Sequence, residues 1–212
     1  MNNYISLFQG TKIGKLEIKN RFSMAPMGPF GFAGENGTFN QRGAEYYIER
    51  AKGGTGLIIT GLCSVENEIE KIVRPSMPCP TINPTAFIMS TKEMTERIHA
   101  YNCKIFLQLT GGFGRAGLPN IIEKAVAPSE IENRWNPNLK HRELTRNEIQ
   151  DYIKKFAQSA AIAKAAGFDG VEIHAVHEGY LIDQFTIGLY NKRNDEYGGN
   201  ITGRLKFPVD IV

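Results

Sequence analysis

The segment His174-Ala-Val-His-Glu-Gly-Tyr180 brings two imidazoles, a carboxylate and a phenol into seven consecutive residues. Imidazole N–H groups can donate hydrogen bonds to a substrate oxygen that gains negative charge, an effect worth on the order of a few kcal/mol. A phenol has an ordinary pKa of about 10, so it is protonated at neutral pH and can deliver a proton. This segment is therefore the first candidate for chemistry.

Two other interpretations of the pair His174 and His177 stay open. A histidine at the end of a strand is often structural, with its ring nitrogens bonded inside the fold. The H-x-x-H spacing also occurs in metal sites, but no third Cys, His or carboxylate is obviously placed to join the pair. We therefore expect no metal here.

Gln108 is a polar residue inside the otherwise apolar stretch 104–109. A buried amide needs hydrogen-bond partners, which would be either backbone groups or the edge of a bound cofactor. The glycines at 111, 112 and 114 resemble part of a dinucleotide fingerprint, but no Rossmann pattern surrounds them, so we interpret them as a turn.

Alternating strands and helices must position these residues. Apolar runs predict strands over 21–27, 56–60, 104–109 and 170–174. Helices are predicted from an N-cap at Asn40 to Gly53, from a capping box at 90–93, from a second capping box at 145–148 to Gly167, and from about Thr202. The stretch 110–144 is predicted to be a long irregular, functional loop, and a polar loop is expected after the fourth strand.

Four strand–helix repeats indicate right-handed parallel βαβ units. In such folds the reactive residues gather at the carboxyl ends of the strands, here residues 26–28, 60–61, 108 and 174–180. A closed eight-stranded barrel needs about 250 residues. The pattern therefore leaves two architectures: an open doubly wound sheet, or a (β/α)8 TIM barrel of which only about the first four βα units are present.

Composition excludes several partners. Lys plus Arg number 25 and Asp plus Glu number 22, so a net charge of +3 gives no reason to expect nucleic acid or a membrane surface. No apolar run is long enough to span a bilayer, and the N-terminus lacks the pattern of a secretory signal. Cys63, Cys79 and Cys103 form no C-x-x-C pair, which fits a reducing, cytoplasmic location with idle thiols.

Ordered motifs carry a family resemblance. They lie at 19–27 (Lys-Asn-Arg-Phe-Ser-Met-Ala-Pro-Met), 108–115 (Gln-Leu-Thr-Gly-Gly-Phe-Gly-Arg), 126–129 (Val-Ala-Pro-Ser), 170–185 and 191–204. Together, over nearly the whole chain, they are similar to the Old Yellow Enzyme-type NADH:flavin oxidoreductases. The His-Ala-Val-His-Glu-Gly-Tyr form most resembles the clostridial 2-enoate reductase and bile-acid reductase branch.

The resemblance implies a barrel with FMN, reduced by NAD(P)H. Residues 1–212 would be the N-terminal part of a single FMN-binding TIM-barrel domain, truncated before the barrel closes. In the longer relatives a C-terminal part, missing here, would add a 4Fe–4S cluster, FAD and a pyridine-nucleotide region. The family's phosphate-binding loops, which follow the seventh and eighth strands, would also lie outside this chain.

The resemblance further implies roles for individual residues. Flavin contacts would come from Pro26, Met27 and Gly28 along the ring, Gly61 facing it, and Gln108 and Arg204 at its pyrimidine edge. In relatives a side chain that tunes the flavin often stands at the position of Gly28. The family's Glu-Asn-Arg-x-Arg-Phe is replaced by Thr-Gly-Arg-Leu-Lys-Phe at 202–207, which alters the start of the helix that carries Arg204.

The implied catalytic residues are His174, His177 and Tyr180. The histidines would hold the carbonyl or carboxylate of a small enoate or enone, and Tyr180 would protonate its α-carbon after flavin N5 gives hydride to the β-carbon. Two alternatives are a non-catalytic truncated fragment, whose open sheet edges favour homo-oligomers, and an unrelated half-barrel that binds a phosphorylated metabolite.

Overall fold

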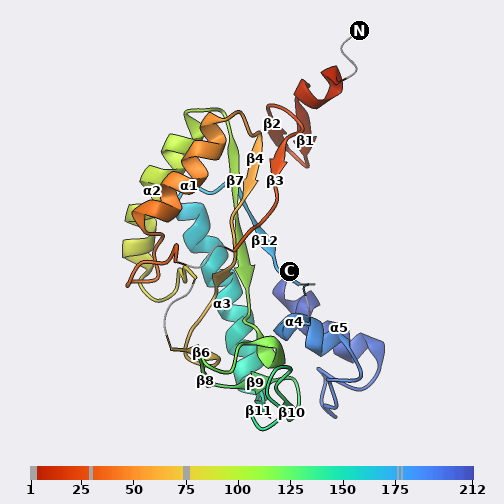
Figure 1. The fold of residues 1–212 in the computed structure, drawn as a ribbon. Helices are drawn as coiled ribbons and strands as arrows, with labels where there is room; N and C mark the ends of the chain where they lie inside the picture. Colours follow the sequence, from red (N-terminus) through yellow and green to blue (C-terminus); the bar gives the residue numbers. More distant parts are fainter. Residues whose placement is uncertain (1–3, 29–30, 74–76, 176, 178) are drawn as a thin grey trace. The chain divides into compact units, whose positions relative to one another are not determined.

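The computed structural model describes residues 4–28, 31–73, 77–175, 177 and 179–212 (Figure 1). Contacts divide the chain into two compact units. The first consists of Met1–Cys63, Pro75–Leu109 and Ala160–Glu172, and the second of Ser64–Arg74, Thr110–Ser159 and Ile173–Val212.

The main sheet runs through the first unit, and four of its strands lie side by side in chain order (Figure 1). These strands are β3 (Ser23–Met24), β4 (Leu57–Ile59), β7 (Lys104–Thr110) and β12 (Gly170–Ile173). The pairs β3–β4 and β4–β7 are parallel. A doubly wound sheet reverses its strand order at a switch point. Because the described part of this sheet shows no such reversal, the order favours the barrel.

The predicted strands are confirmed in position but differ in length. The strand predicted over 21–27 is paired only at β3, and Pro26, which has no N–H, cannot extend a hydrogen-bonded ladder. A fifth strand, β5 (Cys63–Ser64), also pairs with β7. Before the sheet, a short 3-10 turn (Ile5–Phe8) precedes an unpredicted hairpin of β1 (Thr11–Ile13) and β2 (Leu16–Ile18).

Helix α1 (Gln41–Lys52) confirms the predicted cap at its N-terminus. The Asn40 side chain accepts a hydrogen bond from the Gly43 amide at 2.9 Å, and Gly53 ends the helix. Such a cap satisfies one of the amides that the first turn leaves without a helical partner.

Helix α2 (Pro84–His99) begins earlier than predicted, so the capping box at 90–93 is wrong. The cap is Asn83, whose side chain accepts from the Ala86 amide at 3.0 Å. Pro84 follows it at the first helical position, where the missing N–H costs nothing. Ser90 lies inside the helix and donates its hydroxyl to the Ala86 carbonyl at 2.8 Å.

The two helices pack against each other (Figure 1). Arg97 of α2 forms a bidentate ion pair with Glu45 of α1, at 2.6 and 3.0 Å. Fully buried side chains fill the first unit: Tyr47, Ile58, Phe87, Met94, Ile98, Ile105 and Leu107.

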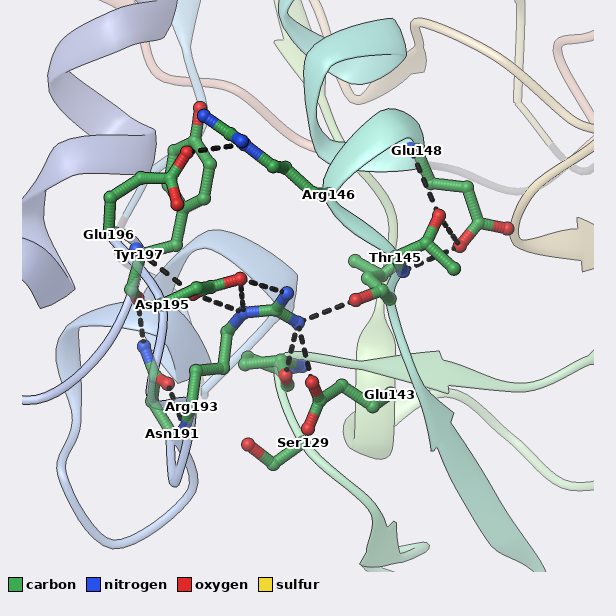
Figure 2. A network of polar contacts seen from close by, with 12 residues as sticks. Ser129, Glu143, Thr145, Arg146, Glu148, Asn191, Arg193, Asp195, Glu196 and Tyr197 are labelled. Atoms are coloured by element: carbon green, nitrogen blue, oxygen red, sulfur yellow. Dashed lines mark hydrogen bonds and ion pairs between the residues drawn. The ribbon is translucent and has the colours of Figure 1, made fainter.

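The second unit contains the start of α3 (Arg146–Ala165), where the predicted capping box is confirmed (Figure 2). The Thr145 amide donates to Glu148 Oε2 at 2.8 Å, and the Glu148 amide donates to Thr145 Oγ1 at 3.2 Å. The stretch 110–144 is predicted to be irregular, and the structure shows that this prediction is wrong for part of it. It contains a 3-10 turn, η2 (Gly114–Ala116), and the strands β8 (Ile122–Lys124), β9 (Val126–Ala127), β10 (Ile131–Glu132) and β11 (Lys140–Glu143).

These strands form small sheets in the second unit. Strand β8 pairs with β6 (Lys71–Ile72), and β11 lies between β10 and β9. Strands of two to four residues are too short for apolar alternation to reveal them.

The polar loop predicted after the fourth strand contains a short helix, α4 (Leu181–Thr186), whose first five residues are buried. The last helix, α5 (Ile201–Ile211), starts one residue before the predicted position and is capped by Asn200, which accepts from the Gly203 amide at 3.0 Å. Among the described helices, none has the length and apolar character that crossing a bilayer requires.

Arg193 holds the loop between α4 and α5 in place (Figure 2). Its side chain is 3% exposed and donates to the carbonyls of Pro128 at 2.8 Å and Leu144 at 2.6 Å. It also pairs with the Asp195 carboxylate at 2.6 Å. One buried cation therefore ties this loop to the segments around β9 and β11.

Candidate active site

Backbone at the ends of β3 and β4 comes together in the first unit. A Cβ added to Gly61 would collide with the Met27 carbonyl, so only glycine permits this approach. The Met27 side chain is 55% exposed, and a Cβ added to Gly28 would meet no atom within 4 Å. The predicted flavin-contacting residues Pro26, Met27 and Gly28 thus belong to a half-buried to exposed strand end, with Gly61 against it.

Gln108 of β7 is buried, and its side-chain partner is an acidic side chain rather than the backbone. Its Nε2 donates to Glu172 Oε1 of β12 at 2.7 Å, while its backbone amide donates to Thr60 Oγ1 at 3.1 Å. Sequence reasoning missed Glu172, although a carboxylate inside the apolar run of β12 is as unusual as Gln108 in β7.

The predicted cluster His174, His177 and Tyr180 is brought together in the second unit. Ring centroids are 5.0 Å apart for the two histidines, 5.3 Å for His174 and Tyr180, and 5.1 Å for His177 and Tyr180. The rings of His177 and Tyr180 are stacked, with 19° between their planes.

His174 is only 8% exposed, and neither of its ring nitrogens has a partner among the described residues. Burial lowers the pKa of His174, and the neighbouring His177 lowers it further, so the ring is neutral at neutral pH. A neutral imidazole offers one N–H donor and one acceptor. Because buried polar groups are normally bonded, these two nitrogens suit a polar ligand.

The loop that carries the cluster is fixed by α4. Asp183 Oδ2 accepts hydrogen bonds from the backbone amides of His177 at 2.7 Å and Gly179 at 3.1 Å. Gln184 Nε2 donates to the carbonyls of Gly179 at 2.6 Å and Phe113 at 3.1 Å. Asp183 and Gln184 were not predicted, because α4 itself was not.

Arg204 lies on α5 and rests on the loop before it. Its Nε donates to the Thr186 carbonyl at 3.1 Å, and its NH1 group donates to the Gly199 carbonyl at 2.6 Å. The altered helix start has a structural reason, since a Cβ at Gly203 would collide with the Gly198 carbonyl. Gln108 and Arg204 belong to different units, so their joint action on a flavin stays a prediction.

The cysteines and the histidine pair are the residues of this chain best suited to bind a metal. Cys63, Cys79 and Cys103 are buried, and none of the three forms a disulfide. Within the described part of the chain, no three His, Cys, Asp or Glu residues gather as they do around a metal ion.

A parallel sheet in chain order, with a reactive cluster just past one of its strands, defines an α/β protein of enzymatic type. Residues 6–212 match the model of the NADH:flavin oxidoreductase / NADH oxidase family, and the chain belongs to this family. The resemblance seen in the sequence motifs is thereby confirmed.

A curated relative of high similarity is a cinnamate reductase from Clostridium sporogenes, 60% identical over 212 residues. This alignment covers 100% of the chain but 32% of the relative, so the chain spans about a third of that protein's length. The resemblance to the clostridial 2-enoate reductase branch agrees with this match.

Solved structures give the fold. The Old Yellow Enzyme homologue from Zymomonas mobilis superposes with a TM-score of 0.80 at 32% identity, covering 97% of this chain and 58% of that one. Morphinone reductase in complex with tetrahydroNAD superposes with a TM-score of 0.81 at 29% identity, covering 97% and 59%. These neighbours indicate an α/β TIM-barrel fold.

Proposed function

We propose that this chain belongs to a flavin-dependent ene-reductase that reduces an activated C=C bond in a 2-enoate or enone. The observation that carries the proposal is the cluster of His174, His177 and Tyr180, in which both ring nitrogens of a buried histidine lack a partner among the described residues. The 60% identity to a protein named cinnamate reductase supports an enoate as the substrate class.

In this proposal the histidines bind the oxygen that activates the double bond. A neutral His174 donates one N–H to the substrate carbonyl or carboxylate, and His177, which is exposed, supplies a second donor. Withdrawing electron density through this oxygen makes the β-carbon accept hydride. Tyr180, in contact with both rings, delivers a proton to the α-carbon.

FMN, when bound, supplies the hydride from N5, and NAD(P)H is the proposed reductant. The backbone of Pro26, Met27 and Gly28 would lie along the ring, with Gly61 facing it. Gln108 would accept at the pyrimidine edge through Oε1, because its amide nitrogen is turned toward Glu172.

Arg204 would add a positive charge at the same edge. Residues 1–212 would then form the N-terminal part of one FMN-binding barrel domain. A 4Fe–4S cluster and FAD would belong to the C-terminal part of longer relatives.

The first experiment asks whether the chain holds the flavin. The purified 212-residue chain is mixed with FMN and desalted, and its visible absorption spectrum is recorded. A retained flavin band supports the proposed cofactor residues. A colourless protein would mean that this chain alone has no working flavin site and is a non-catalytic fragment.

The proton donor is tested by Tyr180→Phe in the flavin-loaded protein, which is this chain where it retains FMN and otherwise a full-length relative with the equivalent tyrosine. Enoate turnover should fall by about 100-fold or more, since a positioned general acid contributes that much. Flavin content should not change. Unchanged turnover would remove Tyr180 from the mechanism.

A further inference from the structure

Glu70 is a buried carboxyl group that lies outside the proposed catalytic cluster and yet holds the turn that contacts it. Glu70 Oε2 accepts the backbone amide of Phe113 at 2.7 Å, and Oε1 accepts that of Gly114 at 2.6 Å. The side chain is almost fully buried, with 5% of the residue exposed. Two hydrogen bonds from adjacent backbone amides to one carboxyl group make this a specific contact that clamps the turn.

The turn itself needs the clamp. Gly112 and Gly114 have φ of +110° and +52°, a conformation that directs successive amides toward Glu70. A Cβ at Gly112 would collide with Glu70 Oε2, so the carboxyl group and the glycine occupy complementary space. Without an acceptor here, two buried amides would lose their partners, which is costly.

Phe113 connects this turn to the proposed proton donor. Its ring packs edge-on against the ring of Tyr180, with 5.0 Å between centroids and 82° between planes. From the opposite side, Gln184 Nε2 donates to the Phe113 carbonyl at 3.1 Å. The backbone that carries the Phe113 ring is therefore held by Glu70 at its amide and by Gln184 at its carbonyl.

We propose that Glu70 is a positioning residue for proton transfer by Tyr180, acting through the Phe113 ring. This inference rests on the proposed function of Tyr180. Glu70 contacts neither substrate nor flavin in the proposal. It holds the Phe113 backbone, and with it the ring against which the phenol packs, so that the proton reaches the α-carbon.

The test is Glu70→Gln in the flavin-loaded protein. A glutamine of the same size offers one acceptor oxygen and sets an NH2 group against the second amide. We expect kcat for the enoate to fall about tenfold, as a misplaced catalytic group does, with KM within about twofold because the histidines still bind the substrate. Oxygen consumption with NAD(P)H should persist, since oxygen takes the electrons without a proton at carbon.

Matched variants separate this role from folding. Glu68→Gln changes an exposed carboxylate two residues away and should leave every rate unchanged. Phe113→Leu keeps both amide bonds to Glu70 but removes the ring, and it should reproduce the loss of kcat with oxidase activity retained. The two losses should not add in the double variant, because both changes act on the same contact.

Each outcome of these assays either supports or overturns the positioning role of Glu70. Normal enoate turnover in Phe113→Leu overturns the inference even if Glu70→Gln fails to fold. Equal losses of enoate and oxygen turnover in Glu70→Gln overturn it too, since they indicate a structural role alone. Tyr180→Phe in the same assays separates the proposed function of Tyr180 from the positioning role of Glu70. If Tyr180→Phe is fully active, the proposed function fails. If Tyr180→Phe is inactive while Glu70→Gln is active, only the role of Glu70 is refuted.

Discussion

Gln108 of β7 donates its side-chain amide to the carboxylate of Glu172 on the neighbouring strand β12, at 2.7 Å. A carboxylate can only accept hydrogen bonds, so this contact fixes which way the amide points. The nitrogen faces Glu172, and Oε1 is the atom left to accept from a ligand. A buried amide that could turn over freely would present either edge.

Glu172→Ala should therefore weaken flavin binding, although Glu172 itself does not contact the flavin in the proposal. Once freed, the Gln108 amide has no preferred orientation, and we expect the Kd for FMN to rise about tenfold, the effect of losing one well-made hydrogen bond. Titration of FMN fluorescence measures the Kd. Glu49→Ala, which removes an exposed ion pair with Lys52, is the control. An unchanged Kd would show that Glu172 does not orient Gln108 toward the cofactor.

The main strands can be predicted from the sequence because their apolar runs are long enough to indicate a buried strand. Strands β4, β7 and β12 fall within one residue of the predicted bounds. Helix starts are less certain, since the Ser90 to Glu93 motif has the letters of a capping box but lies inside α2. Local spacing cannot tell a cap from an interior residue when a better cap, Asn83 before Pro84, stands upstream.

The candidate cluster is predictable for a different reason. His174, His177 and Tyr180 lie on one loop, so closeness in sequence already brings them close in space. Glu70 and Gln184 could not be found this way. They reach the Phe113 turn across sequence separations of 43 and 71 residues, which only the folded chain reveals.

Replacing Arg193 should lower the free energy of unfolding by more than replacing an exposed arginine of the second unit (Figure 2). Arg193→Met leaves the Asp195 carboxylate and two buried backbone carbonyls without their donor, and an unsatisfied buried acceptor costs about 1–3 kcal/mol. Urea unfolding measures this loss. Arg146→Ala, which removes a 70% exposed partner of Glu196, should cost less than about 1 kcal/mol. Similar losses for the two variants would refute the view of Arg193 as the buried link.

Glu148 should stabilise the start of α3 in a pH-dependent way. The Arg142 guanidinium lowers the pKa of Glu148 to about 2, with help from Thr145. Because the folded value lies below the ordinary 4.5, this stabilisation is present above about pH 4.5 and is lost as the pH falls toward 2.

Glu148→Ala should cost about 1 kcal/mol at neutral pH, the usual loss for a capping group, and the cost should shrink on acidification. Urea unfolding at about pH 6 and about pH 3 tests both statements. Glu130→Ala, which removes an exposed partner of Lys140, is the control and should change little. A cost for Glu148→Ala that stays constant with pH would contradict the cause given for it.

Asp183 should keep the reactive loop ordered. Its Oδ2 accepts from the amides of His177 and Gly179, and Asp183→Asn removes the negative charge that strengthens both bonds. We expect both amides to exchange with deuterium about tenfold faster, since each loses a charge-assisted bond. Hydrogen exchange followed by NMR resolves the two sites. Asp151→Asn, on the exposed face of α3, should leave these rates unchanged, and equal rates in both variants would refute the prediction.

Glu70 should make the folded chain less stable as the pH rises. Burial raises the pKa of Glu70 from 4.5 to about 8, the nearby Glu66 raises it further, and the amides of Phe113 and Gly114 oppose the shift. Below about pH 4.5 both folded and unfolded chains hold the proton. Between about 4.5 and 8 only the folded chain does, so the free energy of unfolding falls by up to about 1.4 kcal/mol per pH unit and levels off above 8.

Glu70→Gln carries no titrating proton and should lack this decline. The free energy of unfolding of Glu70→Gln should therefore lie furthest below that of the unaltered chain near pH 5. The difference should narrow toward pH 8. Urea unfolding across this range gives the difference directly, and the histidines, which both proteins share, cancel in it. Curves that run parallel from pH 5 to pH 8 would mean that Glu70 is already ionised in the folded chain, with the two amides outweighing the cost of burial.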